Sequence, residues 1–196
     1  MGMGRRKILT GQTVGVILCG GKSSRMGQDK SCLRLGDTTL LEVTRQHLAA
    51  VTSDVVTAGK DGCDFVDAYE DKGPAMALFS LLEQADIEDG ARLLCMPVDM
   101  PLCSSACLQA TLDASRRNDK SVYAQDAVMP LVLRFSSDGY RQLQERVSGN
   151  HSLSLRGLLS CFDGEAADLQ AFGNELMNVN DPDDWAQLQA RANQQD

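Results

Sequence analysis

The chain has 196 residues, a length typical of one domain, and its hydrophobic (43%) and charged (23%) fractions are those of a globular protein. Its net charge of −8 argues against a nucleic-acid partner, because phosphate backbones require a basic protein surface. No apolar run approaches the length of a membrane span and no convincing export signal is present, so we expect a cytoplasmic protein with no membrane partner.

The elements predicted along the chain alternate between strands and helices. Residues 1–12 are expected to form a flexible, basic extension to a single domain covering residues 1–196. Buried or apolar strands are predicted at 14–18, 54–59, 91–97 and 128–135, the last irregular or at a sheet edge because it contains Pro130. Helices are predicted at 38–51, 74–85, 104–117, 140–147, 153–162 and 180–192.

This alternation predicts an α/β fold with three layers, in which helices flank a mostly parallel, Rossmann-like central sheet. Ligands of such sheets bind beyond the carboxyl ends of the strands. A glycine-rich loop follows the first predicted strand, and Asp99 follows the strand at 91–97. Seven cysteines without an export signal favour buried thiols over a disulfide framework.

The loop after the first strand reads LCGGKSSRMGQDK, residues 18–30, and concentrates the positive charge of the protein. Residues 1–34 contain seven Lys or Arg against one acid, whereas the remainder contains twelve basic and twenty-six acidic residues. Adjacent glycines let backbone amides approach a phosphate, and Arg25 and Lys30 can bind its oxygens. The spacing matches neither a P-loop nor a dinucleotide fingerprint, but it favours a triphosphate.

The pattern G-G-x-S-x-R-M-G-x-D-K resembles the signature loop of nucleotidyltransferases. With YEDKGPAMAL, CMPVDMP and MNVNDPDD further along, the chain resembles the molybdenum cofactor guanylyltransferases, which join GMP from GTP to molybdopterin and release pyrophosphate. The resemblance implies GTP and molybdopterin as substrates and Mg²⁺ as cofactor. We expect a monomer, with other molybdenum cofactor biosynthesis proteins or acceptor molybdoenzymes as partners.

The resemblance also assigns roles to individual residues. Asp99 matches the family's Mg²⁺-binding aspartate, and a carboxylate is a ligand that this cation prefers. With Arg25 and Lys30, Asp99 forms the expected catalytic set, which neutralises charge on the α-phosphate and the leaving pyrophosphate. The expected nucleotide-binding residues are Leu18, Cys19, Gly20, Gly21, Arg25, Lys30, Asp71 and Asp99.

The expected substrate-binding residues are Asn178 and Asn180, which match an asparagine pair of the family. If MNVN is a strand, alternation would bury Met177 and Val179 and direct both asparagines to the same side.

Some positions depart from the family pattern. Cys19 and Ala77 replace smaller residues, Thr57 lies where an amide side chain often contacts the nucleotide, and Met129 lies where some relatives have histidine. Ala77 and Thr57 leave base preference open, and Met129 leaves the pterin contact open. A sister enzyme using CTP or another nucleotide, on molybdopterin or another small phosphorylated substrate, is the first alternative. A non-catalytic nucleotide-binding regulator is the second, although it has no need of a metal-binding carboxylate such as Asp99. A purely structural domain leaves the clustered cations unexplained.

Overall fold

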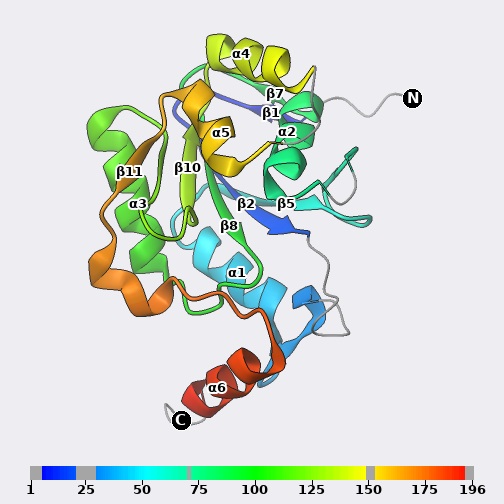
Figure 1. Ribbon diagram of the computed structural model, residues 1–196, viewed down its shortest axis with the longest axis vertical. Helices are drawn as coiled ribbons and strands as arrows, with labels where there is room; N and C mark the ends of the chain where they lie inside the picture. Colours follow the sequence, from blue (N-terminus) through cyan, green and yellow to red (C-terminus); the bar gives the residue numbers. More distant parts are fainter. Residues whose placement is uncertain (1–5, 21–29, 70–71, 149–152, 193–196) are drawn as a thin grey trace.

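A computed structural model describes residues 6–20, 30–69, 72–148 and 153–192. Its central sheet has seven strands in the order β11-β9-β10-β8-β2-β5-β6 (Figure 1). Their bounds are β2 (Thr13–Cys19), β5 (Asp54–Gly59), β6 (Phe65–Val66), β8 (Arg92–Pro97), β9 (Val122–Ala124), β10 (Leu131–Arg134) and β11 (Glu165–Ala167). Only β10 among these strands runs antiparallel to its neighbours, so the predicted mostly parallel α/β sheet is confirmed.

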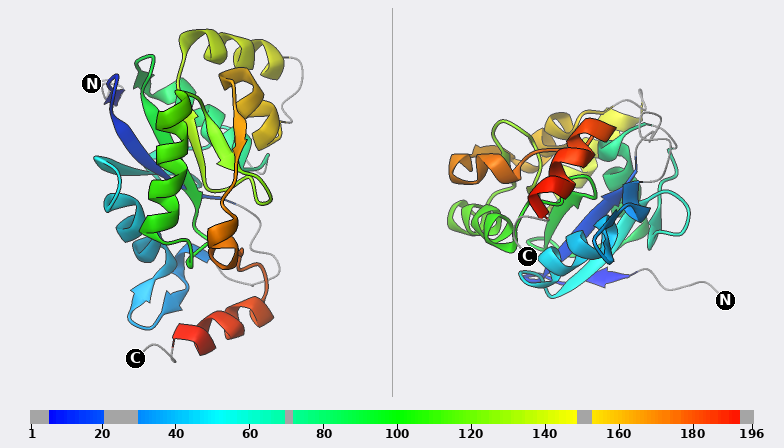
Figure 2. Two further views of the ribbon diagram at one scale, coloured as in Figure 1. Left: turned by 90° about the vertical axis from the view of Figure 1, so that its left-hand side faces the viewer. Right: turned by 90° about the horizontal axis from the view of Figure 1, so that it is seen from below.

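Helices cover both faces of this sheet (Figures 1 and 2). On one face α1 (Leu40–Ala49) contacts β2 and β5, and α3 (Ser105–Asn118) contacts β9 and β10. On the other, α2 (Pro74–Gln84) packs on β5 and β6 and contacts α5 (Leu155–Leu159), beside η3 (Ser160–Phe162) and α4 (Ser137–Val147). None of the described helices is long and apolar enough to cross a membrane.

Local sequence signals explain where the helices begin. The Thr39 side chain accepts from the Glu42 backbone N–H and the Glu42 side chain returns to the Thr39 backbone, a capping box that starts α1. Pro74 occupies the first turn of α2, where its missing N–H leaves no bond unmade. Ser104 caps α3 by accepting from the backbone N–H of Cys107.

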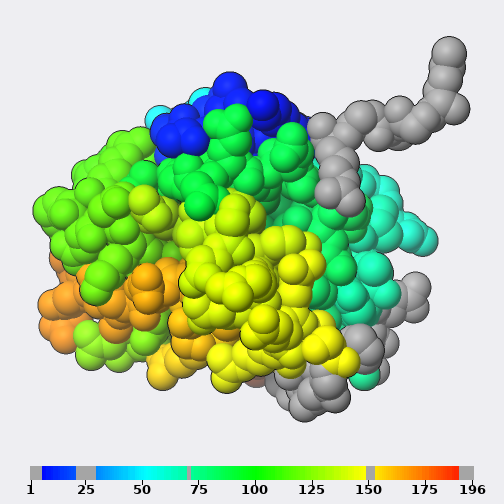
Figure 3. All heavy atoms as spheres, turned by 90° about the horizontal axis from the view of Figure 1, so that it is seen from above, coloured from blue at the N-terminus to red at the C-terminus, as the bar shows by residue number. Residues whose placement is uncertain are grey.

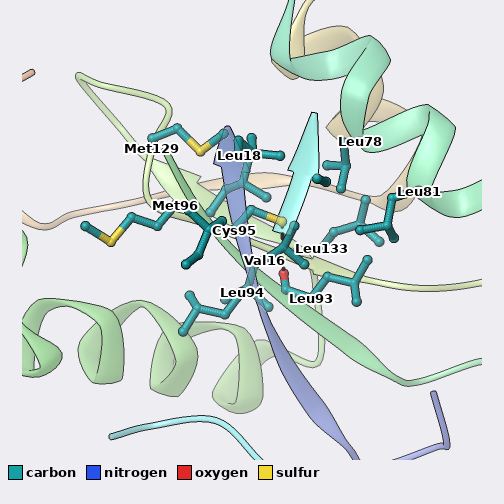
Figure 4. Close-up of a cluster of buried hydrophobic side chains, with 14 of the residues drawn as sticks. Val16, Leu18, Leu78, Leu81, Leu93, Leu94, Cys95, Met96, Met129 and Leu133 are labelled. Atoms are coloured by element: carbon teal, nitrogen blue, oxygen red, sulfur yellow. Dashed lines mark hydrogen bonds between the residues drawn. The ribbon is translucent and has the colours of Figure 1, made fainter. Parts of the chain in front are cut away.

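The core lies between the two buried central strands and the helices. Every residue of β2 is buried, and residues 75–82 of α2 are buried as well, as an all-round apolar helix requires. Figure 4 shows Val16 and Leu18 of β2 against Leu93 to Met96 of β8, with Leu78 and Leu81 of α2 nearby. The seven cysteines are free thiols and five of them are buried, which confirms their expected role as small apolar residues.

Two pairs of short strands were not predicted. β1 (Lys7–Ile8) pairs with β7 (Asp86–Ile87), and β3 (Arg34–Leu35) pairs with β4 (Thr38–Thr39). Two short helices were also not predicted: η2 (Lys30–Cys32) lies between β2 and β3, and η4 (Gln170–Glu175) lies between β11 and α6. Figure 3 shows the residues of β1 in blue, beside the green segment that contains β7. Ile8 is 1% exposed, so this part of the expected extension is attached to the core.

The position of β10 corrects one prediction. Pro130 suggested an irregular or edge strand: the edge position is wrong, because β10 lies inside the sheet between β9 and β8, whereas the start of the predicted segment is irregular, with Val128 at φ +64°. Pro130 is accommodated because it lies just before Leu131, the first residue of β10, where the sheet requires no backbone N–H donor. The Pro130 carbonyl still accepts a hydrogen bond from the Ala124 N–H at 3.1 Å.

The strand order creates one switch point. From β2 the chain crosses through α1 to β5 on one side, whereas from β8 it crosses through α3 to β9 on the other. The connections therefore diverge between the neighbouring strands β2 and β8. Ligands of open α/β sheets bind in the crevice beyond the carboxyl ends at such a point.

Candidate functional site

Three polar side chains meet at this switch point. The Lys30 ammonium donates to Asp99 Oδ2 and to Asn180 Oδ1, at 3.0 Å in each case. Lys30 begins η2, Asp99 follows β8, and Asn180 precedes α6 (Pro182–Ala192). The partners lie 69 and 150 positions from Lys30 in the sequence, so only the tertiary fold brings them together.

Backbone hydrogen bonds hold this cluster in place. The Val98 N–H donates to the Leu18 carbonyl at 3.3 Å, which ties the exit of β8 to β2. The Val179 N–H donates to the Asp99 carbonyl at 2.8 Å, and its side chain is buried. Asp99 therefore binds both the Lys30 side chain and the backbone of Val179, the residue before Asn180.

The start of α6 fixes Asn180 from the other side. Its backbone N–H donates to Asp184 Oδ2 at 2.9 Å, while Asp181 accepts from the N–H groups of Asp183 and Asp184 as the predicted helix cap. Upstream, Glu175 accepts from the backbone and hydroxyl of Ser104 at 2.9 and 2.6 Å. The segment between η4 and α6 is thus anchored at both ends.

The oxygens around Lys30 suit a hard cation. The side chains of Lys30 and Asp99 are only 16% and 21% exposed, so their charges act on one another with reduced screening. Among the described residues no three His, Cys, Asp or Glu side chains gather around one point. A Mg²⁺ ion held by Asp99 would therefore need further oxygens from Asn180, from substrate phosphate or from water, a ligand set common for this ion.

The backbone opens to solvent where β2 ends. Leu18 and Cys19 are buried, whereas Gly20 is exposed, and a Cβ built on it would meet no atom of the described residues within 4 Å. The Cys19 carbonyl accepts from the Lys60 N–H at 3.3 Å. Burial, followed by the neighbouring Cys63, raises the pKa of the Cys19 thiol to about 12, so it remains protonated and unreactive. The expected residues Gly21, Arg25 and Asp71 lie outside the described residues.

Lys60 is a cation that the motifs did not indicate. It follows β5, the neighbour of β2, and its ammonium donates to Ser31 Oγ at 2.9 Å, next to Lys30 in η2. The sequence could have indicated Lys60 as a site residue, because it directly follows the carboxyl end of a predicted strand, where ligands of such sheets bind. Thr57, which lies where an amide side chain often contacts the nucleotide in the family, donates its hydroxyl to Asp64 at 2.9 Å and so stabilises the loop after β5.

The MNVN segment was predicted wrongly as a strand. Residues 177–180 adopt no regular structure, and Met177 is 44% exposed, although Val179 is buried at 5%. Alternation fails because no neighbouring strand pairs with this segment. Asn178 lines a small hollow with Leu102 and Leu188 against α6, and within the described chain it makes no bond to the Lys30 cluster.

Comparison with known proteins identifies the family. Residues 15–162 match the MobA-like NTP transferase domain. The chain belongs to the MobA-like NTP transferase family. The molybdenum cofactor guanylyltransferase of Xanthomonas euvesicatoria is 34% identical over 179 residues, covering 89% of this chain and 93% of that protein.

Solved structures show the same fold. The molybdopterin-guanine dinucleotide biosynthesis protein A of Archaeoglobus fulgidus aligns with a TM-score of 0.71 at 15% identity, over 92% of this chain and 99% of that one. The 2-C-methyl-D-erythritol 4-phosphate cytidylyltransferase of Thermus thermophilus aligns with a TM-score of 0.64 at 16% identity, over 91% and 98%. The MobA-like fold therefore extends over nearly the whole chain, beyond the matched domain.

Proposed function

We propose that this protein transfers GMP from GTP to the terminal phosphate of molybdopterin and releases pyrophosphate. One observation carries the proposal: Lys30, Asp99 and Asn180 form one hydrogen-bonded cluster at the switch point of a MobA-like chain, where β2 and β8 end. Family membership supports the reaction class, and the name of the Xanthomonas relative supports the substrates.

The reaction requires charge neutralisation more than proton transfer. An oxygen of the molybdopterin phosphate forms a bond to the α-phosphorus of GTP, and the bond from that phosphorus to the oxygen bridging to the β-phosphate breaks. The electron pair leaves with pyrophosphate. Because the nucleophile is already an anion, no strong general base is needed, and stabilising the spreading negative charge becomes the main task.

In this proposal Lys30 binds the phosphates as a fixed cation. Its hydrogen bonds to Asp99 and Asn180, both 3.0 Å long, hold the ammonium before the substrate arrives, so little reorganisation accompanies binding. Asp99 and Asn180 would hold Mg²⁺, which when bound polarises the phosphoryl oxygens. We also propose that Gly20, with Leu18 and Cys19 beneath it, receives the phosphates on its open side, and that Arg25 adds a second cation.

The test is turnover by the purified full chain with Mg²⁺ and molybdopterin, supplied with GTP or CTP. Pyrophosphate release and the guanylylated product are measured in the same samples. We expect GTP to be the productive donor. Equal or higher kcat/KM with CTP would identify the sister enzyme instead, and nucleotide binding without pyrophosphate release would indicate a regulator.

Lys30→Met tests the assignment of the cation. Loss of one preorganised charge at the reacting phosphate should lower kcat roughly 100- to 1,000-fold. Lys120→Met is the matched control, since Lys120 forms a surface ion pair with Glu165 at 3.1 Å, is 48% exposed and lies beside β9, outside the cluster. Near-normal turnover in Lys30→Met, or an equal loss in the control, contradicts the assignment.

A further inference from the structure

A larger cavity lies along the same edge of the sheet, apart from the Lys30 cluster. Its volume is about 350 Å³, within the range of small-molecule pockets. Two segments form its walls: residues 125–127, which follow β9, and residues 169–176, which follow β11 and include η4. Neither segment belongs to the motifs that indicated nucleotide binding.

The topology places this pocket within reach of the transfer site. β9 and β11 run in the same direction as β8 and β2, since β10 is antiparallel to both β9 and β8. All four carboxyl ends therefore lie at one edge. β9 is the second neighbour of β8, and at about 4.8 Å between strands the pocket lies roughly 10 Å from the line of Asp99. A molecule with a phosphate at one end and a ring at the other can span that separation.

The rim of the pocket is held rigidly. The Gln125 N–H donates to the Ala167 carbonyl at 3.2 Å, and the Gln125 carbonyl accepts from Arg156 at 3.0 Å. The Arg156 guanidinium lies 5.5 Å from the centre of the Tyr123 ring. The Val128 N–H donates to the Ala124 carbonyl at 2.8 Å and closes the loop. The pocket is thus formed before any ligand arrives, which lowers the entropic cost of binding.

The pocket lining combines an apolar floor with a carboxylate that can bind a ligand. Leu169 is 5% exposed, and with Ala127 and Leu176 it supplies flat apolar surface. Asp126 is exposed, and its carboxylate has no hydrogen-bond or ion-pair partner among the residues that the structure describes. A carboxylate beside an apolar floor suits a planar ring whose edge carries two adjacent N–H donors.

We propose that this pocket binds the pterin ring of the acceptor, with Asp126 accepting from the ring N3–H and 2-amino group. The inference rests on the proposed function, because the acceptor is defined by it. The aminopyrimidinone edge of a pterin presents these two donors side by side, and the phosphate at the other end of the molecule then extends toward Asp99. Guanine presents the same donors, so the test must vary the two substrates separately.

Two variants test the pocket in different ways. Asp126→Asn replaces one carboxylate oxygen by an amide NH2 group, which would face an N–H donor of the pterin ring and could not accept a hydrogen bond from it. Gly173→Leu is designed to fill the cavity: a Cβ at Gly173 meets no atom of the described chain within 4 Å, so a larger side chain can begin in open space at the pocket wall. Asp86→Asn is the control, because Asp86 lies exposed on β7 and its loss changes net charge equally. Melting temperatures of all variants verify that each one folds.

Initial rates are measured with molybdopterin and GTP varied in turn. Loss of the charged hydrogen bonds should raise the KM for molybdopterin roughly 10- to 100-fold in Asp126→Asn, with the KM for GTP and kcat nearly unchanged. Gly173→Leu should raise the same KM, and Asp86→Asn should not. An unchanged acceptor KM in both pocket variants overturns the inference while wild-type turnover still supports the proposed function. A raised KM for GTP instead assigns the pocket to guanine and also overturns it.

A direct binding measurement separates this inference from the proposed function. Binding of free 6-hydroxymethylpterin is followed by quenching of its fluorescence in the absence of GTP. If wild-type protein transfers no GMP but quenches the pterin in a manner lost in both pocket variants, the pocket is supported and the proposed function fails. If neither transfer nor quenching dependent on Asp126 is observed, both fail.

Discussion

Gly59→Ala should destabilise the protein strongly, although it adds only one methyl group. Gly59 ends β5 with φ +141°, and a Cβ at this position would lie 2.5 Å from the Cys19 carbonyl oxygen and 2.8 Å from its carbon. Both atoms belong to the backbone of β2, which cannot rotate away as a side chain can. Gly59 therefore permits the close approach of two strands at the end of β2, next to the exposed Gly20.

The expected cost has two parts. An L-residue held at this φ costs about 1–3 kcal/mol, and forcing apart packed backbone costs about the same again. A total near 4 kcal/mol would lower the melting temperature of a chain of this size by roughly 8–16 °C. Displacement of Cys19 should also move Gly20, so the KM for GTP is expected to rise in the folded fraction.

Urea unfolding followed by circular dichroism gives the free-energy change, and Gly36→Ala provides the control. Gly36 also has positive φ, +61°, but a Cβ there meets no atom within 4 Å. Its replacement should cost only the left-handed backbone strain, about 1–2 kcal/mol. The difference between the two variants isolates the contact with Cys19. Equal losses in Gly59→Ala and Gly36→Ala would refute the reasoning.

Three further predictions concern single residues. Gly20→Ala should change the free energy of unfolding by less than about 1 kcal/mol, because the added Cβ meets no atom of the described residues, yet it should raise the KM for GTP by filling space that a phosphate needs. Asp99→Asn should lower kcat roughly 100-fold or more while circular dichroism stays native, and a small loss would contradict its role. Hydrogen bonds from Arg134 and then Arg92 hold the pKa of Asp119 below its ordinary 3.8, so its stabilising effect is complete above that value and lost as pH falls through the lowered pKa. Asp119→Asn should therefore destabilise the protein at neutral pH, and urea titrations should show the difference disappearing in acid.

Much of the sheet could be predicted because its central strands carry long apolar runs. The whole of β2 and the interior of β8 are buried, and periodicity detects such segments. The edge strands β6 and β11, and β9 beside β11, have only two or three residues, too few for any period to be visible. The internal place of β10 follows from tertiary pairing, which overrode the local preference expressed by Pro130.

The candidate site likewise has a part that the sequence predicts and a part that only the tertiary structure reveals. Lys30, Asp99 and Asn180 lie in recognisable motifs, and the structure shows that they touch. Met177 was expected to be buried because alternation was assumed, but alternation has meaning only where a strand is paired. Asp126 belongs to no motif at all. The wall it helps to form comes from two loops whose proximity is set by the pairing of β9 with β11.

The hydrogen bond from Val179 to Asp99 makes the proposed catalytic centre depend on a segment that is synthesised after every strand of the sheet. All seven strands of the sheet end by Ala167, so the framework can form before Asn180 has emerged from the ribosome. During synthesis the growing protein can therefore reach a folded but chemically incomplete stage. A polypeptide that ends between Ala167 and Asn178 should keep the sheet but show no turnover. Folding of the sheet would then precede assembly of the proposed site during synthesis.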